Sequence, residues 1–161
     1  MTPIPPHLAA HAWYAPHQAW VRDTYGECRH DPAGAAPVRA DLTGADLVAA
    51  NLAGADLAGA RLSGADLAYA DLTGARLYCA VLIGAYLPSA KLAEADLTGA
   101  TLTRAYCTGA DLTGANLTRA YFTRARLAHA DLTNATLTDT DCSTATFINV
   151  TLAGITITRL P

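Results

Sequence analysis

The sequence has no hydrophobic run long enough to cross a membrane as a helix. Two uncharged stretches, Leu77–Ala90 and Cys142–Thr158, contain 14 and 17 residues, and the second is rich in Thr. A membrane-spanning helix needs about 20 apolar residues. The N-terminus, Met1–Pro6, has neither a basic start nor an apolar segment, so we expect no secretory signal and no membrane partner.

Cysteine is scarce, with four residues in the chain. Cys107 and Cys142 occupy positions that the pattern described below gives to Leu, where a thiol behaves as a small hydrophobic group. We therefore expect no disulfide framework, and a reducing, cytoplasmic setting is the default expectation.

The chain also has few residues that suggest chemistry. Four histidines and one cysteine near the N-terminus could ligate a metal, but their spacing fits no familiar zinc pattern; they are His7, His11, His17, Cys28 and His30. Catalysis needs a nucleophile, an acid or base, and a cleft. We expect no enzyme, no metal and no cofactor. The 11 Lys and Arg residues are dispersed, which argues against direct nucleic-acid binding.

What the sequence does contain is a five-residue phrase, repeated twenty-four times without insertion from Ala40 to Arg159. We name its positions inner, outer, Leu, first corner and second corner. The inner residue is almost always Ala, the outer residue is usually polar, and ten of the twenty-four second corner residues are Gly. Exceptions at the Leu position are all apolar: Cys107, Phe122, Cys142, Phe147 and Ile157.

A period of five fits neither a helix nor a long strand, whose periods are about 3.6 and 2. The inner, outer and Leu residues form one short in-out-in extended segment, and Gly suits the corner that follows. We predict that four such units close into a coil of twenty residues. Six coils, stacked at about 4.8 Å, give a rod about 29 Å long, with Leu over Leu inside.

The sequence resembles the pentapeptide-repeat family, whose phrase is A(D/N)LXX. The resemblance implies an all-β solenoid, a right-handed quadrilateral parallel β-helix over residues 40–159, followed by a tail at 160–161. His17-Gln18-Ala19-Trp20 is similar to the His-x-x-Trp of a short helix that precedes the repeats in the family. We therefore expect residues 1–39 to be a Pro-rich segment and an N-terminal helical cap, built on Trp13, His17 and Trp20.

The last coil, from Thr140 to Arg159, has larger inner residues, Val150 and Ile155. We predict that this apolar end is either a plug or a tail-to-tail homodimer contact.

One strip of the predicted surface lacks acidic residues: the two adjacent sides that hold residues 80–89, 100–109 and 120–129. Tyr and Arg are favoured in protein interfaces, and Tyr86 and Tyr106 should stack because they are twenty residues apart. We expect Val81, Ile83 and Pro88 to be exposed nearby. The alternative is chance patterning on a solvated surface. The candidate partner-binding residues are Tyr86, Arg104, Tyr106, Tyr121, Arg124 and Arg126.

The first two coils are the most acidic part. The best-known members of the family resemble a DNA duplex and bind DNA gyrase or topoisomerase. Complete mimicry over about 29 Å would need about 17 negative charges, whereas the repeats hold eleven acidic and eight basic residues. Our first hypothesis is therefore a non-catalytic protein-interaction scaffold, and the alternative is a DNA-mimicking gyrase modulator. The candidate acidic surface is Asp41, Asp46, Asp56, Asp66 and Asp71.

A third possibility is an ice-binding Thr array. Thr136-Leu137-Thr138 precedes Thr156-Ile157-Thr158 by twenty residues, but Asp96 and Asn116 interrupt the column.

Overall fold

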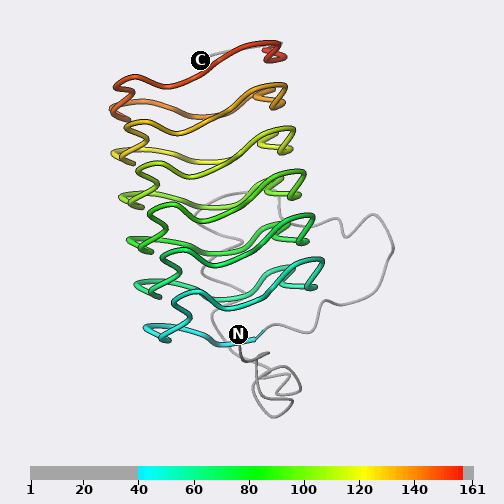
Figure 1. Cartoon of the computed structure of the whole chain (residues 1–161), viewed down its shortest axis with the longest axis vertical. Helices are drawn as coiled ribbons and strands as arrows, with labels where there is room; N and C mark the ends of the chain where they lie inside the picture. Colours follow the sequence, from blue (N-terminus) through cyan, green and yellow to red (C-terminus); the bar gives the residue numbers. More distant parts are fainter. Residues whose placement is uncertain (1–39, 158–161) are drawn as a thin grey trace.

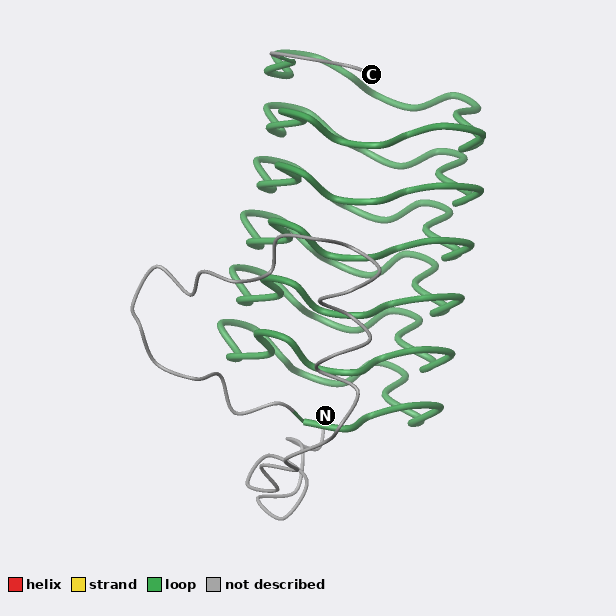
Figure 2. Ribbon diagram, turned by 180° about the vertical axis from the view of Figure 1, so that it is seen from behind, coloured by secondary structure: helices red, strands yellow, loops and turns green. Residues whose placement is uncertain are grey.

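The computed structural model describes residues 40–157, which wind into a rod of stacked coils (Figure 1). Isolated parallel bridges join outer residues twenty positions apart, from Asp41–Arg61 to Thr136–Thr156. This confirms the predicted register of twenty residues a turn. Within residues 40–157 there is no helix and no continuous strand (Figure 2), because a corner follows every three-residue extended segment. The predicted helical cap, with Trp13, His17 and Trp20, lies outside the described residues.

Backbone hydrogen bonds connect each coil to its two neighbours. The N–H of Asp66 donates to the carbonyl of Ala45 at 2.9 Å, and the N–H of Leu47 donates to the carbonyl of Asp66 at 2.8 Å. Second corner residues also donate to the next coil, whereas the N–H of Ala50 closes the turn onto Leu47 at 3.0 Å. Four of the five N–H groups in most units are thereby satisfied by backbone carbonyls, as a dry interior requires.

Every described second corner residue lies in the left-handed region, with φ between 52° and 67°. Ten of them are Gly, but thirteen are not, and these include Arg104, Arg124 and His129. This backbone costs a residue with a Cβ roughly 1–2 kcal/mol. Since the same corner forms with and without Gly, the stacked hydrogen bonds impose it rather than the local sequence alone.

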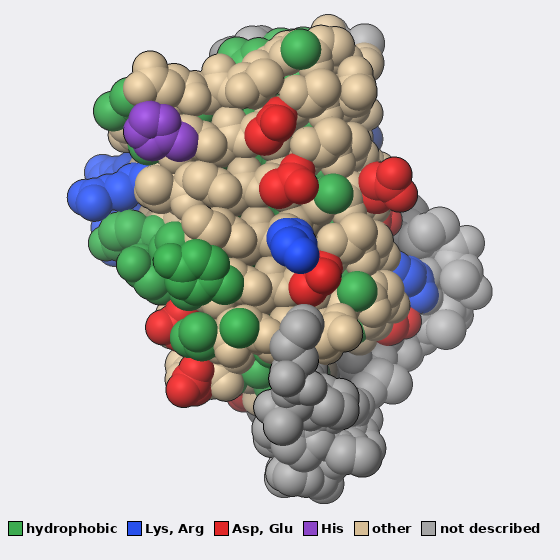
Figure 3. All heavy atoms as spheres, viewed as in Figure 1, with side chains coloured by type: hydrophobic (Ala, Val, Ile, Leu, Met, Phe, Trp, Pro, Cys, Tyr) green, Lys and Arg blue, Asp and Glu red, His purple; other side chains and the backbone are tan. Residues whose placement is uncertain are grey.

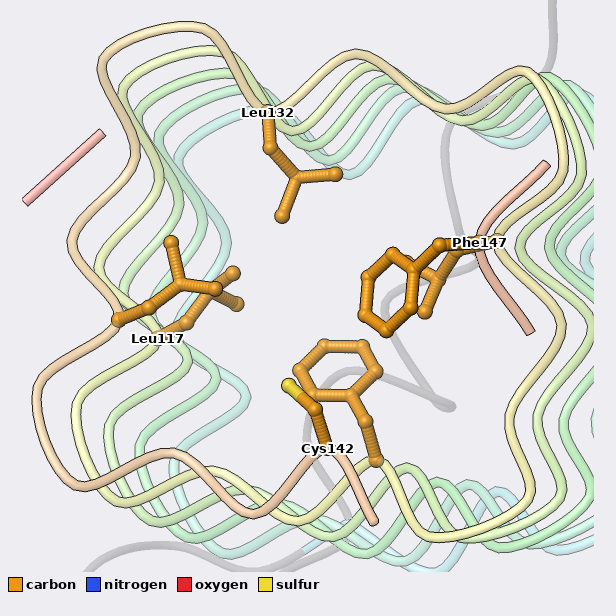
Figure 4. A pocket seen from close by; sticks show the side chains of 7 residues that line it. Leu117, Leu132, Cys142 and Phe147 are labelled. Atoms are coloured by element: carbon orange, nitrogen blue, oxygen red, sulfur yellow. The ribbon is translucent and has the colours of Figure 1, made fainter. Parts of the chain in front are cut away.

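The lumen is filled by Leu and Ala. Leu62 to Leu102 at every Leu position, and the inner Ala residues from Ala60 to Ala105, are fully buried. Phe122 lies in the same lumen column as Cys142, twenty residues later, so a larger side chain is followed by a smaller one. Figure 4 shows the four-sided outline and the labelled side chains pointing inward; no space for a water molecule remains among them.

The last described coil is packed differently. Phe147, Leu152 and Ile157 are 41–45% exposed although they occupy Leu positions. Val150 and Ile155 are half-buried against the core. The described residues therefore leave apolar surface at this end, and the tail-to-tail contact stays a prediction.

Candidate interaction surfaces

The outer Asp and Asn residues hold the corners. The Oδ1 atom accepts a hydrogen bond from the backbone N–H two residues later, as from Ala68 to Asp66 at 3.0 Å. This N–H is the one that receives no backbone partner in the repeat, and an Asx turn satisfies it. The same contact is made by Asp41, Asp46, Asn51, Asp56, Asp71, Asp96, Asp111, Asn116, Asp131 and Asp141.

Hydrogen bonding also perturbs three of these carboxyl groups. The hydroxyl and backbone N–H of Thr73 lower the pKa of Asp71, with a smaller contribution from Lys91. Thr133 lowers the pKa of Asp131 in the same way, and Ser143 lowers that of Asp141. In each case the donors favour the ionised carboxylate.

The candidate acidic surface is not gathered on one side of the rod. Asp41, Asp56 and Asp71 belong to three different sides, and each forms an exposed ion pair with the outer residue of the next coil. The nitrogen-to-oxygen distances are 3.2 Å to Arg61, 2.9 Å to Arg76 and 3.7 Å to Lys91.

The other two members of that set, Asp46 and Asp66, are stacked in one column and paired by a bridge. Neither forms an ion pair with another described residue. Of the five candidate residues, only these two therefore present unpaired charge side by side, which is far from the charge density of a duplex.

After Asp66, toward the C-terminus, the outer residues of the same column are aromatic and then basic. The rings of Tyr86 and Tyr106 lie 5.8 Å apart at 55°, and the guanidinium of Arg126 lies 5.0 Å from the centre of the Tyr106 ring. Aromatic pairs and cation–π contacts of this geometry are attractive. The predicted stacking of Tyr86 on Tyr106 is confirmed, and both side chains remain well exposed, at 46% and 39%.

The chain accommodates tyrosine here without losing a corner. A Tyr side chain at the outer position makes no Asx turn. After Tyr86 the first corner residue is Pro88, which has no N–H to satisfy. From Tyr86 to Arg126 the outer column carries no carboxylate, and its exposed side chains are aromatic and basic.

We use the name tyrosine face for this column and the corner that follows it. Its outer residues are Asp46, Asp66, Tyr86, Tyr106, Arg126 and Thr146, and its corner positions are 48–49, 68–69, 88–89, 108–109, 128–129 and 148–149. Figure 3 shows histidine, basic, hydrophobic and acidic side chains following one another along one edge of the rod.

The tyrosine face carries most of the exposed large hydrophobic residues. Five of the eight lie on it, and the remaining three, Phe147, Leu152 and Ile157, occupy Leu positions of the last coil. Val48 and Ile148, which are 47% and 53% exposed, were not predicted as surface contacts from the sequence. The available signal was a bulky aliphatic residue at a first corner position, where Thr and Ala predominate. The five are Val48, Tyr69, Tyr86, Tyr106 and Ile148.

The predicted strip is narrower than expected. Arg104 and Arg124 are exposed at the corner that precedes the tyrosine face, and neither forms an ion pair with a described residue. Tyr121, on the adjacent side, is half-buried. The expectation that Val81 is exposed was wrong: it is 5% exposed, and Thr101 above it is 2% exposed. Burial there depends on spatial neighbours that position in the repeat does not reveal.

The same expectation also fails in part at the corners, because Ile83 and Pro88 are half-buried. The exposed part of the strip is therefore the tyrosine face and its preceding corner.

Residues 40–157 contain neither a cluster of metal-ligating side chains nor a membrane-spanning helix. No three His, Cys, Asp or Glu side chains gather within residues 40–157, and the candidate ligands His7 to His30 lie outside that range. The same residues form no helix of a length and hydrophobicity that could cross a bilayer.

Two of the three described cysteines are free. Burial raises the pKa of Cys107 to about 12, and burial with the charge of Asp141 raises that of Cys142 to about 11. Cys79, in contrast, is disulfide-bonded, so the prediction of no disulfide is wrong for this residue. Cys79 occupies a second corner position, which does not place its sulfur in the lumen.

Comparison with known proteins agrees with the fold. The family model described as pentapeptide repeats matches residues 40–78, 80–119, 102–139 and 115–154. A pentapeptide repeat protein from the Arabidopsis thaliana thylakoid lumen is 33% identical, with a TM-score of 0.58; the match covers 59% of this chain and 66% of that one, just under two thirds of its length. No protein with a curated description is similar enough in sequence to match.

Two further solved structures are similar. The Nostoc Pcc 7120 pentapeptide repeat protein alr5209 is 33% identical, with a TM-score of 0.40 and coverage of 86% of this chain and 93% of that chain. QnrB1, a plasmid-mediated fluoroquinolone resistance protein, is 15% identical, with a TM-score of 0.35 and coverage of 74% and 79%; a similarity of this size supports no functional argument. The family match and the twenty-residue register together show that this chain belongs to the pentapeptide repeat family.

Proposed function

We propose that this protein is a non-catalytic, rod-shaped scaffold that binds a protein partner through the tyrosine face and its preceding arginine corner. The observation that supports this most is the exposed ladder of Tyr86, Tyr106 and Arg126. Its side chains hold one another in place and yet keep much of their surface in water. Aromatic and Arg side chains that are already ordered lose little entropy on binding.

The electrostatics define the kind of partner. Arg104, Arg124 and Arg126 cluster at the upper part of this surface, and no described acidic residue pairs with them. A partner must therefore supply carboxylates opposite the arginines and apolar surface opposite the tyrosines. A rod with a fixed lateral display of side chains suits this task, as in other solenoids.

A pull-down with a double variant tests the proposal. Tyr106→Thr and Arg124→Gly use residues that the repeat itself places at outer and second corner positions, so the fold should be retained. We expect the double variant to lose proteins that the wild type captures from lysate, with the melting temperature nearly unchanged. Equal capture by both proteins would contradict the proposal, and a large drop in melting temperature would show that the ladder is structural.

The alternative, a DNA-mimicking modulator of DNA gyrase or topoisomerase, has less support. Three of the five candidate carboxylates are paired with bases, and the five are distributed over all four sides. A supercoiling assay with purified gyrase separates the two functions. Inhibition or drug protection at micromolar protein would favour the alternative, and the scaffold proposal predicts neither.

A further inference from the structure

The order of residues along the tyrosine face is itself informative. Its outer column runs from acidic to aromatic to basic: Asp46 and Asp66, then Tyr86 and Tyr106, then Arg126. The corner beside it begins with the exposed Val48 and ends with the exposed Ile148. A surface whose two ends are complementary to each other can pair with an inverted copy of itself.

The midpoint of the tyrosine pair defines how such copies would align. A two-fold axis across the face, between the coils of Tyr86 and Tyr106, sets two rods side by side and antiparallel. Each coil then faces the coil equally far on the other side of the axis. Tyr86 faces Tyr106 of the second copy, and Asp66 faces Arg126 of the second copy.

The flanking corners match under the same operation. Val48 is brought opposite Ile148 of the second copy, so that two exposed aliphatic side chains meet. On the other edge, Arg124 is brought opposite Gly64 of the second copy, a corner without a side chain. One symmetry operation therefore pairs opposite charges and apolar groups, and places a long side chain over open space.

We propose that the occupant of the tyrosine face is a second copy of this chain, docked antiparallel through an isologous two-fold contact. This inference rests on the proposed function, because it names the partner of the same surface. Charge complementarity carries it: Asp66 of the other copy supplies the carboxylate opposite Arg126, and the symmetry gives this ion pair twice. Isologous pairing of this kind is the commonest route to a homodimer.

The small area of the tyrosine face implies a weak dimer. One side of a rod about 29 Å long is small beside the roughly 800 Å² per partner of stable complexes. The dimer should therefore dissociate on dilution. It should also weaken with added salt, since its ion pairs lie in an exposed contact.

Analytical ultracentrifugation with charge-reversal variants tests the contact. The wild type, 16.7 kDa as a monomer, should shift toward twice that mass between about 1 µM and about 1 mM. Arg126→Asp alone places like charges at both ends of the interface, and so does Asp66→Arg alone. Each should raise the dissociation constant by roughly tenfold or more.

Mixing the two single variants is the decisive measurement. In a mixed dimer, Asp at position 126 of one copy faces Arg at position 66 of the other, and the remaining pair is native Asp66 with native Arg126. The mixture should form a heterodimer although each variant alone stays monomeric. Because Asp66 also holds a corner, the melting temperature of each variant is measured in parallel to verify folding.

Arg76→Asp provides the matched control. Arg76 is also an exposed outer Arg, but it lies on the opposite side of the rod, and its ion pair with Asp56 is exposed. It should leave the monomer–dimer equilibrium unchanged. A wild type that stays monomeric to about 1 mM, or a mixture that fails to pair, overturns the inference. Capture of a different protein by the face in the pull-down would still support the proposed function, so the two failures are distinguishable.

Discussion

Asp141 joins its own corner to the preceding coil through two different oxygens. Its Oδ1 atom accepts the backbone N–H of Ser143 at 2.8 Å, and its Oδ2 atom accepts the hydroxyl of Thr123 at 3.2 Å. The carboxylate of Asp141 therefore holds its corner in shape and is more than a surface charge. Asp41 uses its two oxygens in the same way: Oδ1 accepts the backbone N–H of Thr43, and Oδ2 accepts a hydrogen bond from the guanidinium of Arg61.

Acidification should weaken the fold through these carboxylates. The pKa values of Asp71, Asp131 and Asp141 are lowered in the folded chain from a reference of 3.8. Their contribution is therefore fully present above the unfolded-state pKa and is lost as pH falls through the lower folded-state pKa. Urea unfolding should show a constant free energy between pH 7 and about 5, and a decline below about pH 4.

Two substitutions of Asp141 distinguish the effect of its hydrogen bond from the effect of its charge. Asp141→Asn keeps an oxygen acceptor but cannot titrate, so its acid decline should be shallower than that of the wild type. Asp141→Ala removes the acceptor, and should cost about 0.5–1.5 kcal/mol at pH 7. Equal acid profiles for wild type and Asp141→Asn would show that this carboxylate does not contribute.

Two glycines in the same corner position should respond differently to alanine. Gly44 and Gly154 have φ of 66° and 67°, but an added Cβ meets nothing within 4 Å at Gly44, whereas at Gly154 it overlaps Oδ1 of Asn134. Gly44→Ala should cost about 1 kcal/mol. Gly154→Ala should cost roughly 0.5–1.5 kcal/mol more, because the exposed Asn134 side chain must leave its rotamer; urea unfolding measures both. Adding Asn134→Gly should recover most of the extra loss.

Two Leu residues of the lumen should also respond differently to truncation. Leu92 and Leu152 belong to one inward column, but Leu92 is fully buried and Leu152 is 45% exposed. Leu92→Ala should destabilise the protein by about 2–5 kcal/mol through loss of burial and a residual cavity. Leu152→Ala should cost less than half as much, because the Leu152 side chain is already partly in water and its truncation removes fewer packing contacts. Similar losses in thermal unfolding would contradict the difference in packing.

The free thiols should be protected while the chain is folded. With pKa values of about 12 and 11, Cys107 and Cys142 are protonated at pH 8, and a thiol reacts through its thiolate. Iodoacetamide followed by peptide mass spectrometry should label neither residue in native protein, and both in urea. Rapid native labelling of Cys107 would show that the lumen opens readily.

Much of the architecture was readable from spacing. An uninterrupted five-residue phrase predicted the twenty-residue register, which the bridges from Asp41 to Thr156 confirm. It also predicted the buried Leu residues, which are confirmed from Leu42 to Leu137. Stacking of Tyr86 on Tyr106 followed from the same register. The exposed surface was less predictable: Val81 was expected to be exposed and is buried, while Val48 and Ile148 were passed over.

The candidate acidic surface shows why composition was not enough. Asp41, Asp56 and Asp71 were grouped by their position in the first coils, but each lies on a different side and meets a basic residue twenty positions later. These ion pairs join successive residues of one column, and a count of charges does not show which residues are neighbours.

The sequence by itself determined the repeating coil, because a short in-out-in segment followed by a corner can bury its apolar residues in only one stacked register. Only the tertiary structure decided which outer residues remain in water and what each of them contacts. The physical reason is that every side chain in a column is bordered by residues twenty positions away, and by those of the adjoining sides. The antiparallel complementarity of the tyrosine face became visible only when these columns were placed in space.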